Sequence, residues 1–400
     1  MSDMKFQING WYKKYKFQIF LVLGLRVCYS IWLAIVWIVI DKYIPLSEGV
    51  LWETYYNLER SSTLLGRAFI DVWLRWDAVH YMNIAAFGYE GVGVADTVFF
   101  PLYPYFVGMI SKITSINVTL IGILSSSIFT IFALIYFFKL VILLFNDEKL
   151  AKLSVMLLAL FPTAFFLHAP YTEAMFLFFS IGSIFYVEKK ELIIGSLFAC
   201  AASLVRPQGL LLLIPISITL MREFKRNKNS FQLHQVLSLL IAPSGIMSFS
   251  LWRANYAHTG LILSINKFSN ITFQDPISTL YFVFISLFKD PSVIRTLELI
   301  SVVFFLYILI WMFRKKEFRT HLGILLYSSA TWLLITSKTS VNNFAPRLTN
   351  RYVLFIFFAF VGIAYLFEKF NDKKQKIILF VFLIINFLLL TLYTLWVYIG

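Results

Sequence analysis

Long apolar runs separated by short basic clusters dominate the pattern of this chain. The runs have the length that a helix needs to cross a bilayer, and the clusters are typical of loops that stay on the cytoplasmic side. Since the chain must leave and return between consecutive clusters, each gap between them should hold an even number of spans. The basic clusters are the N-terminus, 149–152, 189–190, 222–228, 314–319 and 369–376.

The requirement for an even number of spans in each gap decides which apolar runs should not cross the membrane. The first gap holds one run too many, and its stretch 98–113 is short and carries Pro101 and Pro104. We therefore predict an interfacial or re-entrant helix there. The run 276–290 is a second non-crossing piece, because it is interrupted by prolines and charges, namely Pro276, Lys289, Asp290 and Pro291.

The fold class predicted by this pattern is an all-α polytopic membrane protein that forms a single domain over 1–400. Its N-terminus should be cytoplasmic and its C-terminus outside, and 41–117 should form a first outer loop with non-crossing helices. Internal repeats are not evident, which disfavours a transporter built from inverted halves. The predicted spans, about eleven in number, are 17–40, 118–145, 152–168, 171–187, 191–206, 208–221, 232–256, 293–313, 320–336, 351–368 and 377–398.

Composition supports the membrane class and excludes several others. Hydrophobic residues make up 60% of the 400 residues, charged residues make up 14%, and the mean hydropathy is +0.78. The net charge of +14 comes from clusters between apolar runs, so it indicates topology and no nucleic-acid partner. Cys28 and Cys200 both lie in apolar runs, which excludes a disulfide framework. The first run is too long for a signal peptide and should remain as an anchor.

Polar residues that are unusual in a membrane protein gather on the outer side of this map. They occupy the first outer loop, the turns 168–173 and 206–209, and the later outer loop 337–351. Together these segments could line one cavity that opens outward. The first outer loop contributes Asp77, His80, Glu90 and Asp96.

Asp77 is the most informative of these residues. It follows Trp76 and is flanked by Arg75 and His80. A carboxylate at a membrane surface beside such groups suggests a general base that works on a lipid-linked substrate. The alternative is a solvated aspartate that caps the short helix after it.

The other candidates also have structural interpretations. Glu173 is suited to a helix N-terminus, where the dipole favours a carboxylate. Arg206 can extend from a helix end towards lipid headgroups. His168 fits an interfacial hydrogen bond, and a metal role is disfavoured because no second histidine stands at ligand spacing. Arg347 and Arg351 are basic residues on the outer side, against the usual trend, and they too can be structural anchors.

Several short motifs follow one another between about residues 74 and 215, with a weaker one near 347–352. In this order and spacing they resemble the PIG-V mannosyltransferase family, which belongs to the GT-C superfamily of membrane glycosyltransferases. The chain is more compact than the eukaryotic members, and Arg-Pro-Gln-Gly replaces their Arg-Ser-Asn-Gly type of string, which favours a bacterial or archaeal relative. The motifs are Trp76-Asp77-Ala78-Val79-His80, Phe99-Phe100-Pro101-Leu102-Tyr103-Pro104, Phe161-Pro162-Thr163-Ala164-Phe165-Phe166, Ala169-Pro170-Tyr171-Thr172-Glu173 and Arg206-Pro207-Gln208-Gly209.

The resemblance implies a GT-C-like bundle, a polyprenyl- or dolichyl-phosphate-linked sugar as donor, and a catalytic carboxylate at Asp77. The acceptor is expected to be a glycolipid or glycan hydroxyl, and its direct attack would invert the anomeric centre. No cofactor is firmly expected, although a divalent metal stays possible. We expect Asp77, Glu173 and His80 to be catalytic, Arg206, Arg347 and Arg351 to bind the donor phosphate, and Trp76, Tyr171, Gln208 and His168 to bind substrate.

The resemblance also implies a location. The protein should be a multi-pass protein of the plasma membrane in a prokaryote, or of the endoplasmic reticulum membrane in a eukaryote, with its active site on the extracytoplasmic side. Two other classes share a polytopic architecture: a flippase or transporter of lipid-linked sugars, and a non-catalytic protein of envelope assembly. A transporter predicts charges near the midplane of several spans, whereas here they concentrate at one face.

Overall fold

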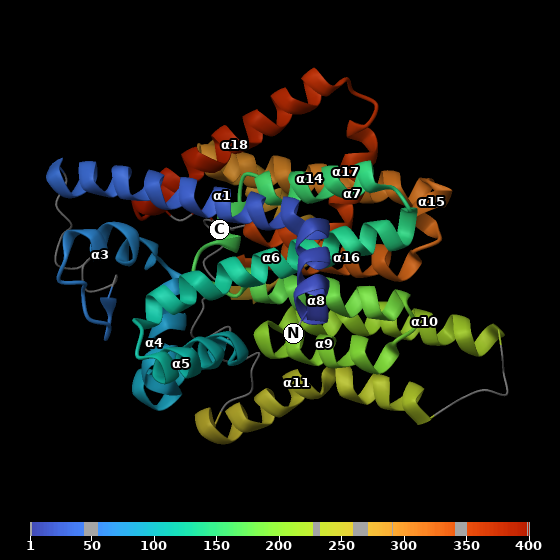
Figure 1. Cartoon of the computed structure of the whole chain (residues 1–400), viewed down its shortest axis with the longest axis horizontal. Helices are drawn as coiled ribbons and strands as arrows, with labels where there is room; N and C mark the ends of the chain where they lie inside the picture. The colour runs from blue at the N-terminus through green and yellow to red at the C-terminus, as the bar shows by residue number, and fades with distance from the viewer. Residues whose placement is uncertain are drawn as a thin grey trace.

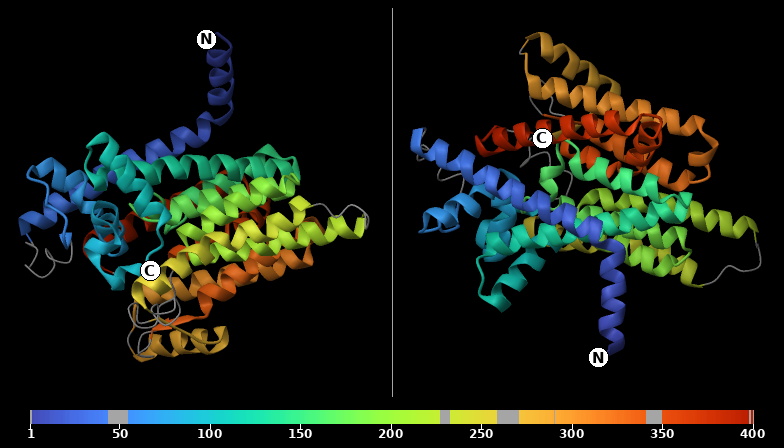
Figure 2. Two further views of the ribbon diagram at one scale, coloured as in Figure 1. Left: turned by 90° about the horizontal axis from the view of Figure 1, so that it is seen from below. Right: turned by 45° about the horizontal axis from the view of Figure 1, so that its top comes forward.

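Helices form nearly all of the computed structural model, which describes residues 2–43, 55–226, 233–258, 271–289, 291–340, 350–397 and 399. Most of the helices run in roughly the same direction and pack side by side (Figure 1). The first helix, α1, lies across this bundle, and its N-terminal end projects away from it (Figure 2). The predicted helical fold class is thus confirmed for the part of the chain that is described.

Five described helices are long and apolar enough to cross a membrane. Each of them coincides with a predicted span, so the chain is a multi-pass membrane protein. They are α1 (Ser2–Tyr43), α6 (Val118–Phe145), α11 (Leu233–Ala257), α14 (Val293–Arg314) and α18 (Asp372–Thr394).

The other predicted spans are helical but shorter, and several boundaries were wrong. The span predicted over 152–168 ends as a helix at Leu160, because Pro162 cannot continue the hydrogen-bonding pattern, and a 3-10 turn follows. The spans predicted over 208–221 and 351–368 likewise begin with 3-10 turns. The elements are α7 (Glu148–Leu160), η3 (Ala164–Leu167), α8 (Glu173–Glu188), α9 (Leu192–Val205), η4 (Pro207–Leu212), α10 (Leu213–Arg226), α15 (Lys316–Arg319), α16 (Leu322–Thr336), η5 (Asn350–Phe355) and α17 (Phe357–Phe367).

The first outer loop contains several short helices. The stretch predicted as a non-crossing helix forms α5, which starts directly after Pro101 and packs against α4. Gly108 allows this contact, because a Cβ there would stand 2.2 Å from the carbonyl oxygen of Ala85. The elements are α3 (Leu64–Phe69), η1 (Asp71–Trp73), α4 (Asp77–Val92), η2 (Val94–Val98) and α5 (Leu102–Thr114).

The all-helical prediction has one exception. Two short strands, β1 (Ile271–Phe273) and β2 (Lys338–Ser340), pair antiparallel, with Phe273 opposite Lys338. Three-residue strands are too short for an alternating pattern to reveal. The ladder connects the segment before α13 (Pro276–Lys289) to the segment after α16.

The buried core centres on α8, which lies between α6 and α9, while α9 packs against α11. Helix α6 is defined by its ends: the Asn117 side chain accepts hydrogen bonds from the backbone at its start, and Asn146 stops it in a left-handed conformation. Arg26 of α1 faces this core, where it donates to the Ser127 hydroxyl at 2.9 Å and covers the Trp73 ring at 4.5 Å. Hydroxyl, carbonyl and aromatic groups therefore surround its guanidinium inside the bundle, and no described carboxylate is in contact with it.

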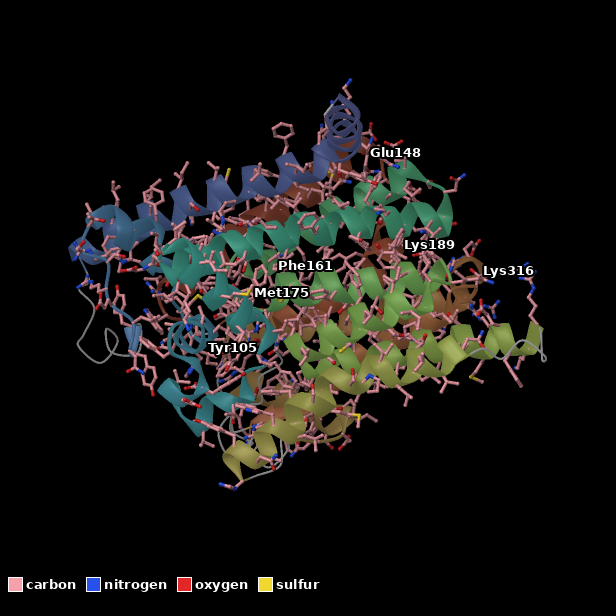
Figure 3. All side chains as sticks on the ribbon, turned by 60° about the horizontal axis from the view of Figure 1, so that its bottom comes forward. Tyr105, Glu148, Phe161, Met175, Lys189 and Lys316 are labelled. Carbon is pink, nitrogen blue, oxygen red and sulfur yellow. The ribbon has the colours of Figure 1, made fainter. Side chains whose placement is uncertain are left out.

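The two ends of the bundle differ in character. Glu148, Lys189 and Lys316 lie at one end, whereas Tyr105 of α5 lies towards the other (Figure 3). The basic clusters between the helices and the helices of the first outer loop are therefore separated along the bundle. Glu173, the first residue of α8, belongs to the end that carries the outer-loop helices, since it contacts Arg351, which also binds Asp77 of that loop.

Candidate active site

Asp77 is the first residue of α4, directly after a strained backbone position. Trp76 adopts φ 53° and ψ −125°, a combination that side-chain-bearing residues rarely take and that costs about 1–3 kcal/mol. The Trp76 ring packs edge-on against Trp396, with the ring centres 5.5 Å apart. The surrounding structure therefore holds the Trp76–Asp77 junction in a fixed conformation at the start of a helix.

The C-terminal end of α18 holds the segment before Asp77. The Tyr393 hydroxyl donates to the carbonyl oxygen of Trp73 at 2.9 Å, and Arg75 Nε donates to the carbonyl oxygen of Thr394 at 3.3 Å. Arg75 is almost fully buried, and its guanidinium also lies over the Trp396 ring. Arg75 is thus a structural residue that joins the first outer loop to the C-terminal end of α18.

Four charged residues from distant segments form one chain of ion pairs. The Asp77 carboxylate accepts from Arg351 Nη2, and Arg351 Nε lies 3.3 Å from Glu173 Oε1. Arg206 Nη1 donates to the same Glu173 oxygen at 2.9 Å. Glu173 is fully buried and Arg351 is 3% exposed, whereas the Asp77 side chain is 29% exposed. Asp77 is therefore the most exposed of the residues in these three ion pairs.

Aromatic and hydroxyl groups position the two arginines. Thr172 Oγ1 accepts from Arg206 Nη1 at 2.7 Å. Tyr171 lies with its ring 5.0 Å from the Arg351 guanidinium, and its hydroxyl donates to the carbonyl oxygen of Arg75 at 2.8 Å. The predicted motif around Tyr171 thus supports Arg351 directly and links it to the segment before Asp77.

The electrostatic surroundings favour an ionised Asp77. Burial by itself raises the pKa of this carboxyl group, but the positive charge of Arg351 and its hydrogen bond lower it more, with smaller contributions from His80 and Arg206. The net effect is a pKa below the usual range of aspartate. The alternative that Asp77 caps α4 does not describe its contacts, because its carboxylate is bound to Arg351.

His80 stands one helical turn after Asp77 and forms a pair with Asp96. Its Nδ1 lies 2.6 Å from Asp96 Oδ1, and its ring stacks on Phe99 with the centres 4.8 Å apart. Burial lowers the pKa of His80, but the hydrogen bond and charge of Asp96, together with the charge of Asp77, raise it above its usual value. The His80 side chain is 46% exposed while Asp96 is 6% exposed. The aspartate therefore fixes the ring and leaves part of it accessible.

Lys338 and Tyr352 belong to this cluster, although the sequence did not single them out. The Tyr352 ring lies 4.4 Å from the Arg206 guanidinium, 5.2 Å from that of Arg351 and 5.1 Å from the Lys338 ammonium group. The sequence signals were the place of Lys338 in the outer loop 337–351 and that of Tyr352 at the end of the weaker motif near 347–352. Three cations, two of them members of the ion pairs described above, consequently surround the Tyr352 ring.

Other predicted site residues are placed differently. His168 is buried against Tyr29, with ring centres 5.1 Å apart, and has no described contact with Asp77 or Glu173. Gln208 lies in η4, two residues after Arg206, and is buried with an Oε1 atom that lacks a hydrogen-bond partner. Arg347 lies outside the described residues. Among the residues that are described, no group of three or more histidine, cysteine, aspartate or glutamate side chains could hold a metal ion.

Comparison with known proteins identifies the family. The sequence model of the family described as Mannosyltransferase (PIG-V) matches residues 30–265, which include Asp77, Glu173 and Arg206. GPI mannosyltransferase 2 of Schizosaccharomyces pombe is 26% identical over 142 residues, which correspond to 34% of this chain and 30% of the yeast protein. The shared stretch is thus about a third of either chain.

A solved structure supports the fold. The crystal structure of ArnT from Cupriavidus metallidurans bound to undecaprenyl phosphate superposes with a TM-score of 0.52 at 12% sequence identity. The likeness covers 78% of this chain and 61% of ArnT, and it shows a shared GT-C fold. With the family match extending over more than half of its length, the chain belongs to the Mannosyltransferase (PIG-V) family of membrane glycosyltransferases.

Proposed function

We propose that this protein transfers a mannosyl group from a polyprenyl- or dolichyl-phosphate donor to a hydroxyl group of a glycolipid or glycan acceptor. The observation that carries the proposal is the accessible, ionised Asp77 at the end of a buried chain of arginines and carboxylates. A base and positive charge stand side by side, as transfer of a sugar from a phosphate requires. The family membership supports mannose as the sugar.

The donor class is supported by the chemistry of the leaving group. A lipid phosphate leaves readily once positive charge is held near it, and Arg206 and Arg351 supply two fixed guanidinium groups. Arg347, which lies outside the described residues, was predicted for the same role. ArnT, which shares the fold, binds undecaprenyl phosphate in its crystal structure, which favours a lipid phosphate here as well.

The transfer proceeds in one displacement. The acceptor oxygen forms a bond to the anomeric carbon while the bond from that carbon to the phosphate oxygen breaks, which inverts the anomeric centre. Asp77 accepts the proton of the acceptor hydroxyl. His80 stands one turn after Asp77 in α4, is fixed by Asp96 and is partly exposed. It takes the proton from Asp77 towards solvent. The bonding electrons leave with the lipid phosphate.

Two buried oxygen atoms suit the hydroxyl groups of a sugar. Glu173 Oε2 and Gln208 Oε1 are both buried and have no hydrogen-bond partner among the described residues. Both residues stand close to Arg206. The other carboxylate oxygen of Glu173 accepts a hydrogen bond from Arg206, and Gln208 follows Arg206 by two residues in the sequence. A buried acceptor that lacks a partner costs free energy, which a sugar hydroxyl would recover by donating to it. The half-buried Trp76 can offer an apolar surface beside Asp77.

Purified protein tested against a panel of polyprenyl-phosphate sugars, with and without a chelator of divalent metals, checks this function. We expect transfer from the mannosyl donor and release of free polyprenyl phosphate in equal amounts. A flippase would instead move the intact donor between leaflets of a vesicle without cleaving it. A non-catalytic protein of envelope assembly would do neither.

We further propose that the active site faces the extracytoplasmic side, with about eleven spans and a cytoplasmic N-terminus. The separation of the basic clusters from the outer-loop helices supports this orientation (Figure 3). After replacement of Cys28 and Cys200, a cysteine at the exposed Glu90 should react with an impermeant thiol reagent in sealed cells. A cysteine at the exposed Lys316 should react only after permeabilisation. The opposite labelling pattern would place the site on the cytoplasmic face.

The His80–Asp96 pair predicts a shift in the pH profile of transfer. His80 must be neutral to take a proton, so turnover should fall as the pH drops through its pKa. Asp96 raises that pKa, and Asp96→Asn removes the charge responsible while burial still lowers it. The acidic limb of the profile should therefore move to lower pH in Asp96→Asn. Glu90→Gln, an exposed change on the same helix, should leave the limb in place; an unmoved limb in Asp96→Asn would remove His80 from the proton path.

A further inference from the structure

We propose that Lys338 is the residue that holds the phosphate group of the lipid-linked donor. The inference rests on the proposed function and assigns a residue to it that lies in none of the motifs shared with the family. It follows from the balance of charges around Tyr352. Three cations, Arg206, Arg351 and Lys338, stand there against two carboxylates, Asp77 and Glu173.

The two arginines are already committed to the carboxylates. Arg206 donates to both Thr172 and Glu173, and Arg351 contacts both Asp77 and Glu173. A phosphate that recruited either guanidinium fully would leave the buried Glu173 with less compensation. Separating one partner from a buried ion pair is strongly unfavourable. The arginines are therefore better suited to hold the carboxylates and to add a general positive potential.

Lys338 is the cation of this cluster that has no carboxylate partner within the described part of the chain. Its ammonium nitrogen lies 5.1 Å from the centre of the Tyr352 ring, and its backbone is fixed by the β1–β2 ladder. An ammonium group carries three donors, and a ring face occupies none of them with a full hydrogen bond. Lys338 thus brings to the site a positive charge that is not in contact with a described carboxylate, together with donors for a new ligand.

The surroundings of Lys338 favour an anion beside it. Burial lowers the pKa of Lys338, and the positive charges of Arg206 and Arg351 lower it further, whereas Tyr352 and, to a smaller extent, Asp77 raise it. A phosphate in contact with the ammonium group would supply more negative charge and stabilise the charged form. The gain is largest for the released lipid phosphate, which carries more negative charge than the sugar-linked donor. Lys338 should consequently stabilise the leaving group more than the bound donor.

Binding of undecaprenyl phosphate to the full-length protein tests this inference without any need for turnover. Lys338→Met keeps most of the apolar stem and removes the charge. We expect it to weaken binding of undecaprenyl phosphate by about 10-fold or more, as expected for the loss of a charge-assisted hydrogen bond. Binding of the uncharged alcohol undecaprenol should not change. Lys338→Arg, which restores the charge, should recover part of the affinity.

Lys139→Met is the matched control. Lys139 of α6 is also half-buried over a tyrosine ring, that of Tyr136 at 4.7 Å, but it lies beside Phe185, at the opposite end of α8 from Glu173. The Lys139→Met variant should bind undecaprenyl phosphate as tightly as the unchanged protein does. Thermal melting of both methionine variants shows whether either one is misfolded. If Lys338→Met is misfolded, the binding experiment is repeated with Lys338→Gln.

The outcomes separate this inference from the function itself. If the unchanged protein binds undecaprenyl phosphate no better than undecaprenol, the proposed lipid-phosphate donor is wrong. If it discriminates between the two and a folded Lys338 variant discriminates equally well, the phosphate is held elsewhere and this inference is overturned. An excess of phosphatidylglycerol that displaces undecaprenyl phosphate would show a general headgroup site, which also contradicts the assignment.

Discussion

Asp77→Asn should lower the rate of sugar transfer by at least about 100-fold, in line with the usual contribution of a general base. The substitution keeps the size of the side chain and its ability to accept from Arg351, but the amide cannot take a proton at useful pH. Donor affinity should be kept or rise slightly, because the donor phosphate no longer meets the negative charge of Asp77. Single-turnover transfer and equilibrium binding of the donor, measured on the same preparation, give the two quantities separately.

Glu90→Gln is the control for this experiment. It makes the same carboxylate-to-amide change on the same helix at an exposed position. Its transfer rate should match that of the unchanged protein. Near-normal transfer by Asp77→Asn would end the role of Asp77 as base, while the family membership would stand.

Glu173→Gln should destabilise the protein by about 3–5 kcal/mol, the usual cost of removing one partner from a buried ion pair. The fully buried Glu173 carboxylate contacts Arg206 and Arg351 at 2.9 and 3.3 Å. A neutral amide would leave Arg206 without a carboxylate and Arg351 with Asp77 alone. Thermal melting in detergent, or unfolding in denaturant, should show the loss, and transfer should fall as the arginines move.

Glu188→Gln provides the comparison at the other end of the same helix. Glu188 is 19% exposed and lies 3.8 Å from His321, a loose contact whose loss should cost little. A melting temperature for Glu173→Gln equal to that of Glu188→Gln would mean that Glu173 carries no essential charge. The ion pairs of Glu173 with Arg206 and Arg351 would then not contribute to the stability of the fold.

The sequence predicted the members of this site better than their contacts. Asp77, Glu173 and Arg206 stand in ordered motifs, so their chemistry could be inferred from residue types and spacing. The sequence could not show that Arg351 binds Asp77 across 274 positions, because that pair depends on how η5 and α4 meet in the fold. The same limit explains why Lys338 was missed: its importance depends on which neighbouring cations are already neutralised.

Local backbone chemistry explains the wrong helix boundaries, and packing decides where a predicted side chain lies. Apolarity alone extended one predicted span through Pro162, whereas the missing backbone donor ends α7 at Leu160. His168 was predicted to bind substrate and stands in the outer turn 168–173, and in the structure its ring packs against Tyr29 in the core. Hydropathy reports how apolar a segment is, but it does not report which face of a turn points inward.

The contact between the end of α18 and the segment before Asp77 has a consequence for biosynthesis. Tyr393 lies 320 positions after Trp73, the residue of this segment that it binds, so Tyr393 and Thr394 are synthesised long after the first outer loop. Until they are in place, the nascent chain holds Asp77 on a loop that lacks these contacts. The segment before Asp77 can therefore reach its final structure only after α18 has been inserted, and a chain that terminates before α18 would leave this segment without its support.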